Sequence, residues 1–124
     1  MAQPTQQDAQ LMLQLAQYLE STTNIDGAPN LYGASFPKTY EAFRAAYPDE
    51  TGPAWKAVRA TSTFFETTGL LVRRGLFSKE LALDWILVDG PWRALAPIIE
   101  HWRTEMGEPQ LFEHFEWLAK QQTA

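Results

Sequence analysis

The sequence contains no cysteine. Without a thiol the chain cannot form a disulfide, a thiolate zinc site, an iron–sulfur cluster or a cysteine nucleophile. The absence of disulfides fits a reducing compartment, so we expect a cytoplasmic protein. The N-terminal residues show no basic region followed by an apolar run, so we also expect no secretory signal.

Long apolar runs and excess positive charge are also missing. The stretch LMLQLAQYL is interrupted twice by glutamine and is too short to span a bilayer, so we expect no membrane span. The net charge is −5 and the isoelectric point is about 4.9. An acidic chain without a stripe of Lys and Arg repels phosphate backbones, which argues against nucleic-acid binding.

Familiar catalytic and metal-binding motifs are absent from the sequence. It contains neither a Gly-x-Ser-x-Gly elbow nor a glycine-rich phosphate loop. The two histidines, His101 and His114, lack the glutamate three residues earlier that carboxylate-bridged di-iron bundles require. We expect His101 and Glu105 to form an ordinary pair on a helix surface, and His114 to be exposed. The sequence predicts no cofactor.

Apolar side chains are plentiful enough for one core. The chain has 124 residues, of which 45% are hydrophobic, and these include five tryptophans. A chain of this length buries roughly two-thirds of the surface that its unfolded form exposes, which supports one domain over residues 1–124. Much of that core must be built from large flat rings.

The spacing of the apolar residues predicts helices. Leu11, Leu15, Tyr18 and Leu19 recur on one face of a helix over about 5–23. A loop rich in Gly and Pro follows at about 24–37 and leads to a helical core at 38–122. We expect this long loop either to pack through its apolar residues or to be mobile, and these residues are Leu31, Tyr32 and Phe36.

The third helix carries the clearest pattern, over about 53–74. Apolar and small residues follow an unbroken 3-4-3-4-3 spacing, which indicates a seam facing another helix, and they are Trp55, Val58, Ser62, Phe65, Gly69 and Val72. The small side chains at Ser62 and Gly69 predict the close approach of a neighbouring backbone or ring. Gly75 should end the helix in the left-handed conformation.

Four further helices are expected. Pro37 suits the first turn of a short second helix, Ser78 caps a fourth that reaches about Val88, Asp89 caps a fifth that bends at Pro97, and Pro109 opens a sixth. We expect the core-facing residues of these helices to include Leu87 and Met106, and the chain to fray from Gln121. No run of alternating β-branched residues occurs. The sequence therefore predicts an all-α fold, an irregular bundle of about five to six helices without a β-sheet.

The candidate site residues are charged and aromatic. Glu66 lies in an apolar helix, and an inward carboxylate needs a partner such as Arg73, Arg93 or Arg103. A structural ion pair is the simpler interpretation, and the alternative is a ligand site formed by Glu66, Arg73, His101 and Arg103. Two interpretations are likewise open for Trp55, Trp92 and Trp102: they are core residues, or they line an aromatic pocket.

Three stretches together form a pattern that is more specific than the helical spacing alone. They are FFETTGLLVRRGLFSKELALDW (64–85), WRALAPIIEHWR (92–103) and FEWLA (115–119). They resemble a family of small bacterial all-helical domains of unknown function, over about residues 64–119. Many members of that family look membrane-anchored through an N-terminal hydrophobic helix. Here the first helix is amphipathic and rich in glutamine, so the resemblance implies a soluble helical domain and no assigned activity.

Two functions follow from this sequence as hypotheses. The first is a non-enzymatic domain for protein–protein interaction or oligomerisation. In that case we expect a homo-oligomer, such as a dimer in which the N-terminal helix docks on a neighbouring chain. The alternative is a small-molecule-binding protein or enzyme with a pocket between the third and fifth helices.

Overall fold

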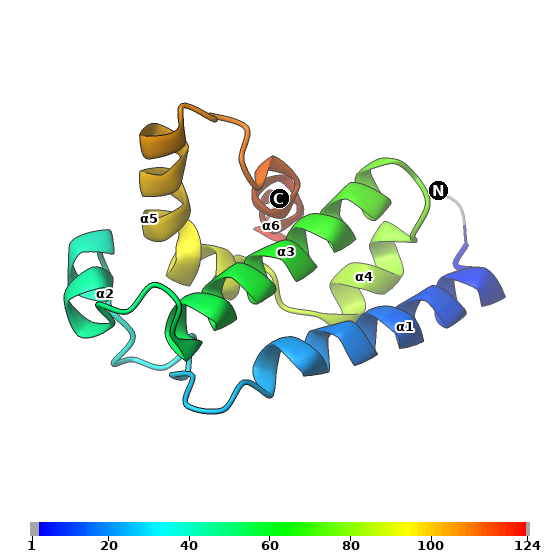
Figure 1. The fold of residues 1–124 in the computed structure, drawn as a ribbon. Helices are drawn as coiled ribbons and strands as arrows, with labels where there is room; N and C mark the ends of the chain where they lie inside the picture. The colour runs from blue at the N-terminus through cyan, green and yellow to red at the C-terminus, as the bar shows by residue number, and fades with distance from the viewer. Residues whose placement is uncertain (1–2, 124) are drawn as a thin grey trace.

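The computed structural model describes residues 3–123, and these residues form six α-helices without a strand (Figure 1). The helices are α1 (Gln6–Thr23), α2 (Tyr40–Ala46), α3 (Pro53–Arg73), α4 (Lys79–Trp85), α5 (Asp89–Met106) and α6 (Glu113–Thr123). This arrangement confirms the predicted all-α bundle.

Helix α3 lies at the centre of the fold. It packs against α1, α4 and α6, while α5 packs against α6 and α2 (Figure 1). All six residues of the predicted seam are buried, from Trp55 at one end to Val72 at the other. The helix ends as expected, with Gly75 in the left-handed conformation at φ 75°.

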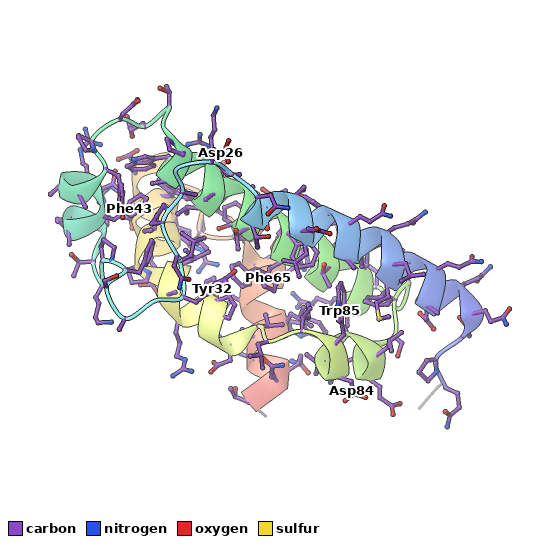
Figure 2. The ribbon with its side chains drawn as sticks, turned by 90° about the horizontal axis from the view of Figure 1, so that it is seen from below. Asp26, Tyr32, Phe43, Phe65, Asp84 and Trp85 are labelled. Carbon is purple, nitrogen blue, oxygen red and sulfur yellow. The ribbon has the colours of Figure 1, made fainter. Side chains whose placement is uncertain are left out.

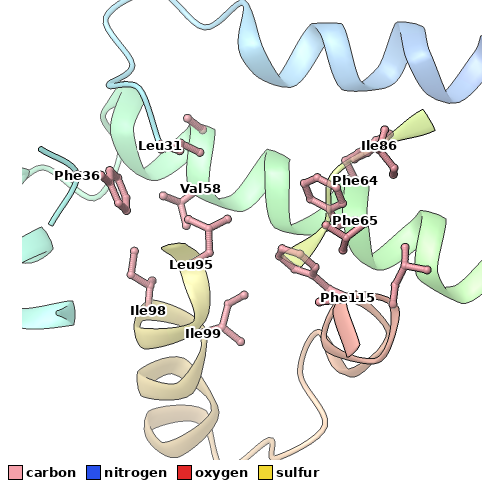
Figure 3. Packing of buried hydrophobic residues seen from close by; sticks show 14 of the residues in the cluster. Leu31, Phe36, Val58, Phe64, Phe65, Ile86, Leu95, Ile98, Ile99 and Phe115 are labelled. Atoms are coloured by element: carbon pink, nitrogen blue, oxygen red, sulfur yellow. The ribbon is translucent and has the colours of Figure 1, made fainter. Parts of the chain in front are cut away.

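The core combines aromatic rings with aliphatic side chains from several elements (Figure 3). The rings of Phe65 and Phe115 stack with their centres 4.8 Å apart, which joins α3 to α6. On the other side of the core, Leu95 and Ile99 of α5 are fully buried. Full burial of one such side chain contributes about 1.5–3 kcal/mol, so this contiguous cluster is the main source of stability.

The long loop between α1 and α2 is packed into this core. Leu31 and Phe36 are each 6% exposed and pack the loop against the helices. The side chain of Tyr32, by contrast, is half-exposed. The following helix begins at Tyr40, later than the predicted start at Pro37. The hydroxyl of Thr39 sets that start, because it accepts a hydrogen bond from the Ala42 amide at 3.0 Å.

The link from α4 to α5 corrects two expectations. Ser78 caps α4 as predicted, but the helix ends at Trp85 and leaves Leu87 78% exposed. Asp89 is not the cap of α5, because the side-chain oxygen of Gln122 accepts hydrogen bonds from the Val88 and Asp89 amides at 2.7 and 2.9 Å. The predicted fraying from Gln121 is therefore wrong, since α6 continues to Thr123.

Helix α5 contains the predicted proline and ends at a glycine. Pro97 lies inside the helix, and Figure 1 shows the helix changing direction along its length. Gly107 closes the helix in the left-handed conformation at φ 66°. Met106, expected in the core, is 59% exposed and is the last residue of α5.

Candidate functional site

The side chain of Glu66, which lies on α3, caps the start of α6. Its side-chain oxygen Oε1 accepts hydrogen bonds from the amides of His114 and Phe115, both at 2.9 Å. These are the second and third residues of α6, whose amides have no partner within the helix. The partner of Glu66 is thus the start of α6, not the expected arginine, and α6 begins at Glu113 rather than at Pro109.

Gly69 explains why α6 can start there. A Cβ atom added to Gly69 would overlap the carbonyl oxygen of His114 and lie 2.7 Å from its carbonyl carbon. The predicted close approach to this small seam position is therefore made by the backbone of α6. The same contact partly buries His114, which we expected to be exposed: its side chain is only 16% exposed.

Arg103 joins α5 to the first turns of α6. Its guanidinium lies 3.0 Å from a carboxylate oxygen of Glu116, donates to the carbonyl of Leu111 at 2.8 Å, and lies over the ring of Trp92 at 5.6 Å. Burial favours the neutral form of Glu116, but hydrogen bonds from Arg103 and Lys120 outweigh it and lower the pKa of this carboxyl group. The arginine–carboxylate pair between helices exists, with Glu116 in the place expected for Glu66.

The other two predicted polar residues lie in different contacts. The guanidinium of Arg73 lies over the ring of Trp117 at 5.4 Å. His101 stacks on Tyr40 with ring centres 3.5 Å apart, and its Nε2 lies 3.1 Å from Glu105. The four residues Glu66, Arg73, His101 and Arg103 thus lie in four separate sets of contacts, each with partners of its own.

The three tryptophans predicted to line a pocket are core or boundary residues. Trp55 is 1% exposed, packs at 6.3 Å from the ring of Trp102, and donates from its indole N–H to the carbonyl of Tyr47. Trp92 packs edge-on against Phe115 at 5.1 Å. These contacts fill the space between the helices.

A groove of about 970 Å³ opens on another side of the molecule. It is bounded by the end of α1, the loop at 24–39, the α4–α5 link and the first turns of α5. Figure 2 shows that Tyr32, Phe65 and Trp85 lie between α1 and the α4–α5 segment. The lining residues are Leu19, Thr23, Leu31, Tyr32, Gly33, Ala34, Phe36, Pro37, Lys38, Phe65, Trp85, Ile86, Leu87, Gly90, Pro91, Arg93 and Ala94.

The groove is mainly apolar. Leu31, Phe36, Phe65 and Ile86 are buried residues that form its inner surface, whereas Leu87 is exposed at its edge. Sites for small molecules typically have volumes of about 300–1,000 Å³ and combine apolar walls with a few polar groups. In size and composition this groove matches such a site.

The polar groups of the groove are few. Burial raises the pKa of the Tyr32 hydroxyl, which a hydrogen bond with Thr61 only partly offsets. This hydroxyl therefore remains neutral near pH 7. Lys38 and Arg93 are the charged residues of the lining.

The sequence analysis predicted this groove only in part. Phe65 belongs to the third helix and Ala94 to the fifth, the two helices between which a pocket was predicted. The lining nevertheless includes none of the proposed residues, because the loop at 24–39 and the α4–α5 link supply most of it. The apolar residues of a loop of unusual length were the available indication.

Residues 3–123 contain neither a cluster of metal ligands nor a helix able to span a membrane. Within that range no three His, Cys, Asp or Glu side chains come together as ligands for a metal ion would. Over the same residues no helix combines the length and the apolar character needed to cross a bilayer.

A family model matches almost the whole chain. The sequence profile of a family described as "Domain of unknown function (DUF4760)" matches residues 4–122. No curated protein and no solved structure matches the chain. The match extends well beyond the stretches that carried the resemblance.

Proposed function

Because the chain belongs to the family described as a domain of unknown function (DUF4760), we propose its function from its own surface: a non-enzymatic binding domain whose groove holds a small apolar molecule. The groove of about 970 Å³ carries this proposal. It replaces the pocket near Glu66 and Arg103 as the candidate binding site.

The contacts of the other candidate residues support binding rather than catalysis. Oε1 of Glu66 accepts from two backbone amides, and Arg103 binds Glu116 and a carbonyl group, while its Nη2 has no hydrogen-bond partner in residues 3–123. A catalytic acid or base must instead reach the substrate with a free proton or lone pair. The groove, by contrast, presents an apolar surface that folding has left open.

A neutral fluorescent probe tests this proposal. N-phenyl-1-naphthylamine emits strongly only in apolar surroundings, so we expect saturable fluorescence with the folded wild-type chain. The variant Ala94→Phe places a ring in the groove and should abolish that signal. Gly90→Leu is a second blocking variant, because space around a Cβ atom at Gly90 is open.

The control is the fold of each variant. Circular dichroism and the melting temperature must match those of the wild type, because an unfolded chain also binds such probes. Absence of binding to the wild type, or equal binding to the wild type and both blocking variants, would contradict the proposal.

Assembly into a homo-oligomer through α1 is the second candidate function. Leu13 favours it, because this leucine is 63% exposed on a helix whose buried residues are Leu15 and Thr22. Light scattering at tens of micromolar gives the oligomeric state, and a monomer would contradict this second candidate.

A cytoplasmic location is compatible with either proposed function, since the chain has no cysteine that could be oxidised.

A further inference from the structure

The charge of the groove differs from that of the chain. Acidic residues outnumber basic ones, 15 to 10, yet no Asp or Glu lines the groove. The charged lining residues are both basic: Lys38 comes from the loop and Arg93 from α5. A site in an acidic protein that presents only cations favours an anion by charge complementarity.

Both cations can reach a ligand. Lys38 is exposed and forms no ion pair with any residue in the range 3–123. Arg93 pairs with Asp89 at 2.9 Å, but its side chain remains 75% exposed. A guanidinium has five N–H donors, so this pair leaves donors for a second acceptor.

The rest of the groove limits how much charge a ligand carries. Apart from the two cations, the lining is mainly apolar and includes the aromatic rings of Tyr32, Phe36, Phe65 and Trp85. Asp89 already offsets the charge of Arg93, so a second negative charge against this surface would cost free energy without a net positive charge to compensate it. Since the Tyr32 hydroxyl stays neutral, it does not repel an anion.

Building on the proposed function, we propose that the ligand is a small amphiphile with one negative charge, such as a medium-chain carboxylic acid. Its apolar body lies along the surface formed by Leu31, Phe65 and Ile86, and its carboxylate binds Lys38 and Arg93. The occupant is a free small molecule rather than a peptide or a second copy of the chain.

Competition against the neutral probe tests the charge preference. Decanoate, decanol and decyltrimethylammonium have the same alkyl chain and differ in charge, so each is titrated against bound N-phenyl-1-naphthylamine. We expect decanoate to displace the probe at a concentration roughly 1.4-fold to fivefold below that of decanol, the range that an exposed charge pair gives. The cation should be the weakest competitor, and added salt should reduce these differences.

A double variant assigns the preference to its residues. Lys38→Gln with Arg93→Gln should bind the probe and decanol as the wild type does, while decanoate loses its advantage. The matched control is Lys56→Gln with Arg74→Gln, which removes the same charge from exposed residues outside the groove. This control should retain the preference for decanoate.

Three outcomes would overturn the inference. The first is equal competition by decanoate and decanol, and the second is a preference for decanoate that survives in the double variant. The third is dimerisation that Ala94→Phe abolishes, which would make a second copy the occupant. If the wild type does not bind the probe at all, the proposed function itself fails, so the two failures are distinguishable.

Discussion

At the scale of single residues, side chains from distant positions stabilise the starts of α5 and α6. Val88 occupies the cap position of α5 and has no side-chain acceptor, and α6 begins after Phe112, whose φ is 57°. Gln122 and Glu66 supply the missing acceptors. An unpaired amide at a partly buried helix start is costly, so each of these bonds fixes where one helix begins.

Replacement of Glu66 by alanine should weaken the fold through α6. The two amides of His114 and Phe115 lose their acceptor, so we expect the free energy of unfolding to fall by about 1–2 kcal/mol, as for the loss of a strong cap. Glu66→Gln keeps an acceptor oxygen and should lose less. Urea unfolding of the three proteins measures this, and equal stability of Glu66→Ala and the wild type would contradict the capping role.

At the scale of elements, the contact between α3 and α6 depends on a glycine. A glycine inside a helix costs about 1 kcal/mol relative to alanine, so its presence at Gly69 requires a reason. The reason is the carbonyl of His114, which occupies the space of a side chain. Close contact of the two backbones at this point lets Glu66, one turn earlier on α3, reach the first amides of α6.

Two glycine-to-alanine changes should therefore have opposite effects. At Gly69 the added methyl group must push α6 away, and we expect a net loss of about 1–3 kcal/mol in unfolding free energy. At Gly90, also helical, a Cβ atom meets no other atom within 4 Å, so alanine should raise stability by up to about 1 kcal/mol. Thermal and urea unfolding compare the pair, and a loss of the same size at both sites would refute this explanation.

At the scale of the whole molecule, carboxylates form hydrogen bonds between segments that lie far apart in the sequence. Asp8 accepts hydrogen bonds from the Thr5 amide at 2.8 Å and the Ser78 amide at 2.9 Å, which ties the start of α1 to the start of α4. These two bonds lower the pKa of Asp8. The pKa of Glu116 is lowered as well.

Acid should therefore destabilise the fold. A carboxyl group whose pKa is lower in the folded chain stabilises it above the unfolded pKa of about 4, and this contribution is lost as the pH falls through the folded pKa. We expect the urea midpoint to be steady from pH 7 to about pH 5 and to decrease below pH 4. Asp8→Asn should show a smaller decrease, and the same pH dependence in both proteins would count against the role of Asp8.

Much of the fold followed from local patterns. The seam of α3, the left-handed end at Gly75 and the cap at Ser78 were predicted because periodicity and capping act over a few residues. The starts of α5 and α6 were wrong because their acceptors, Gln122 and Glu66, lie more than 30 residues away in the sequence.

The sequence by itself determined the helical class, the seam of α3 that faces another helix and the need for a close approach at Gly69, because each depends on spacing and side-chain size along one helix. Only the tertiary structure decided the partner of Glu66 and the place of the groove. A distant acceptor and an open surface both arise where segments meet, and no local pattern specifies which segments do. The loop at 24–39 is the clearest case, since it lines the groove together with the first turns of α5 and brings Lys38 to it.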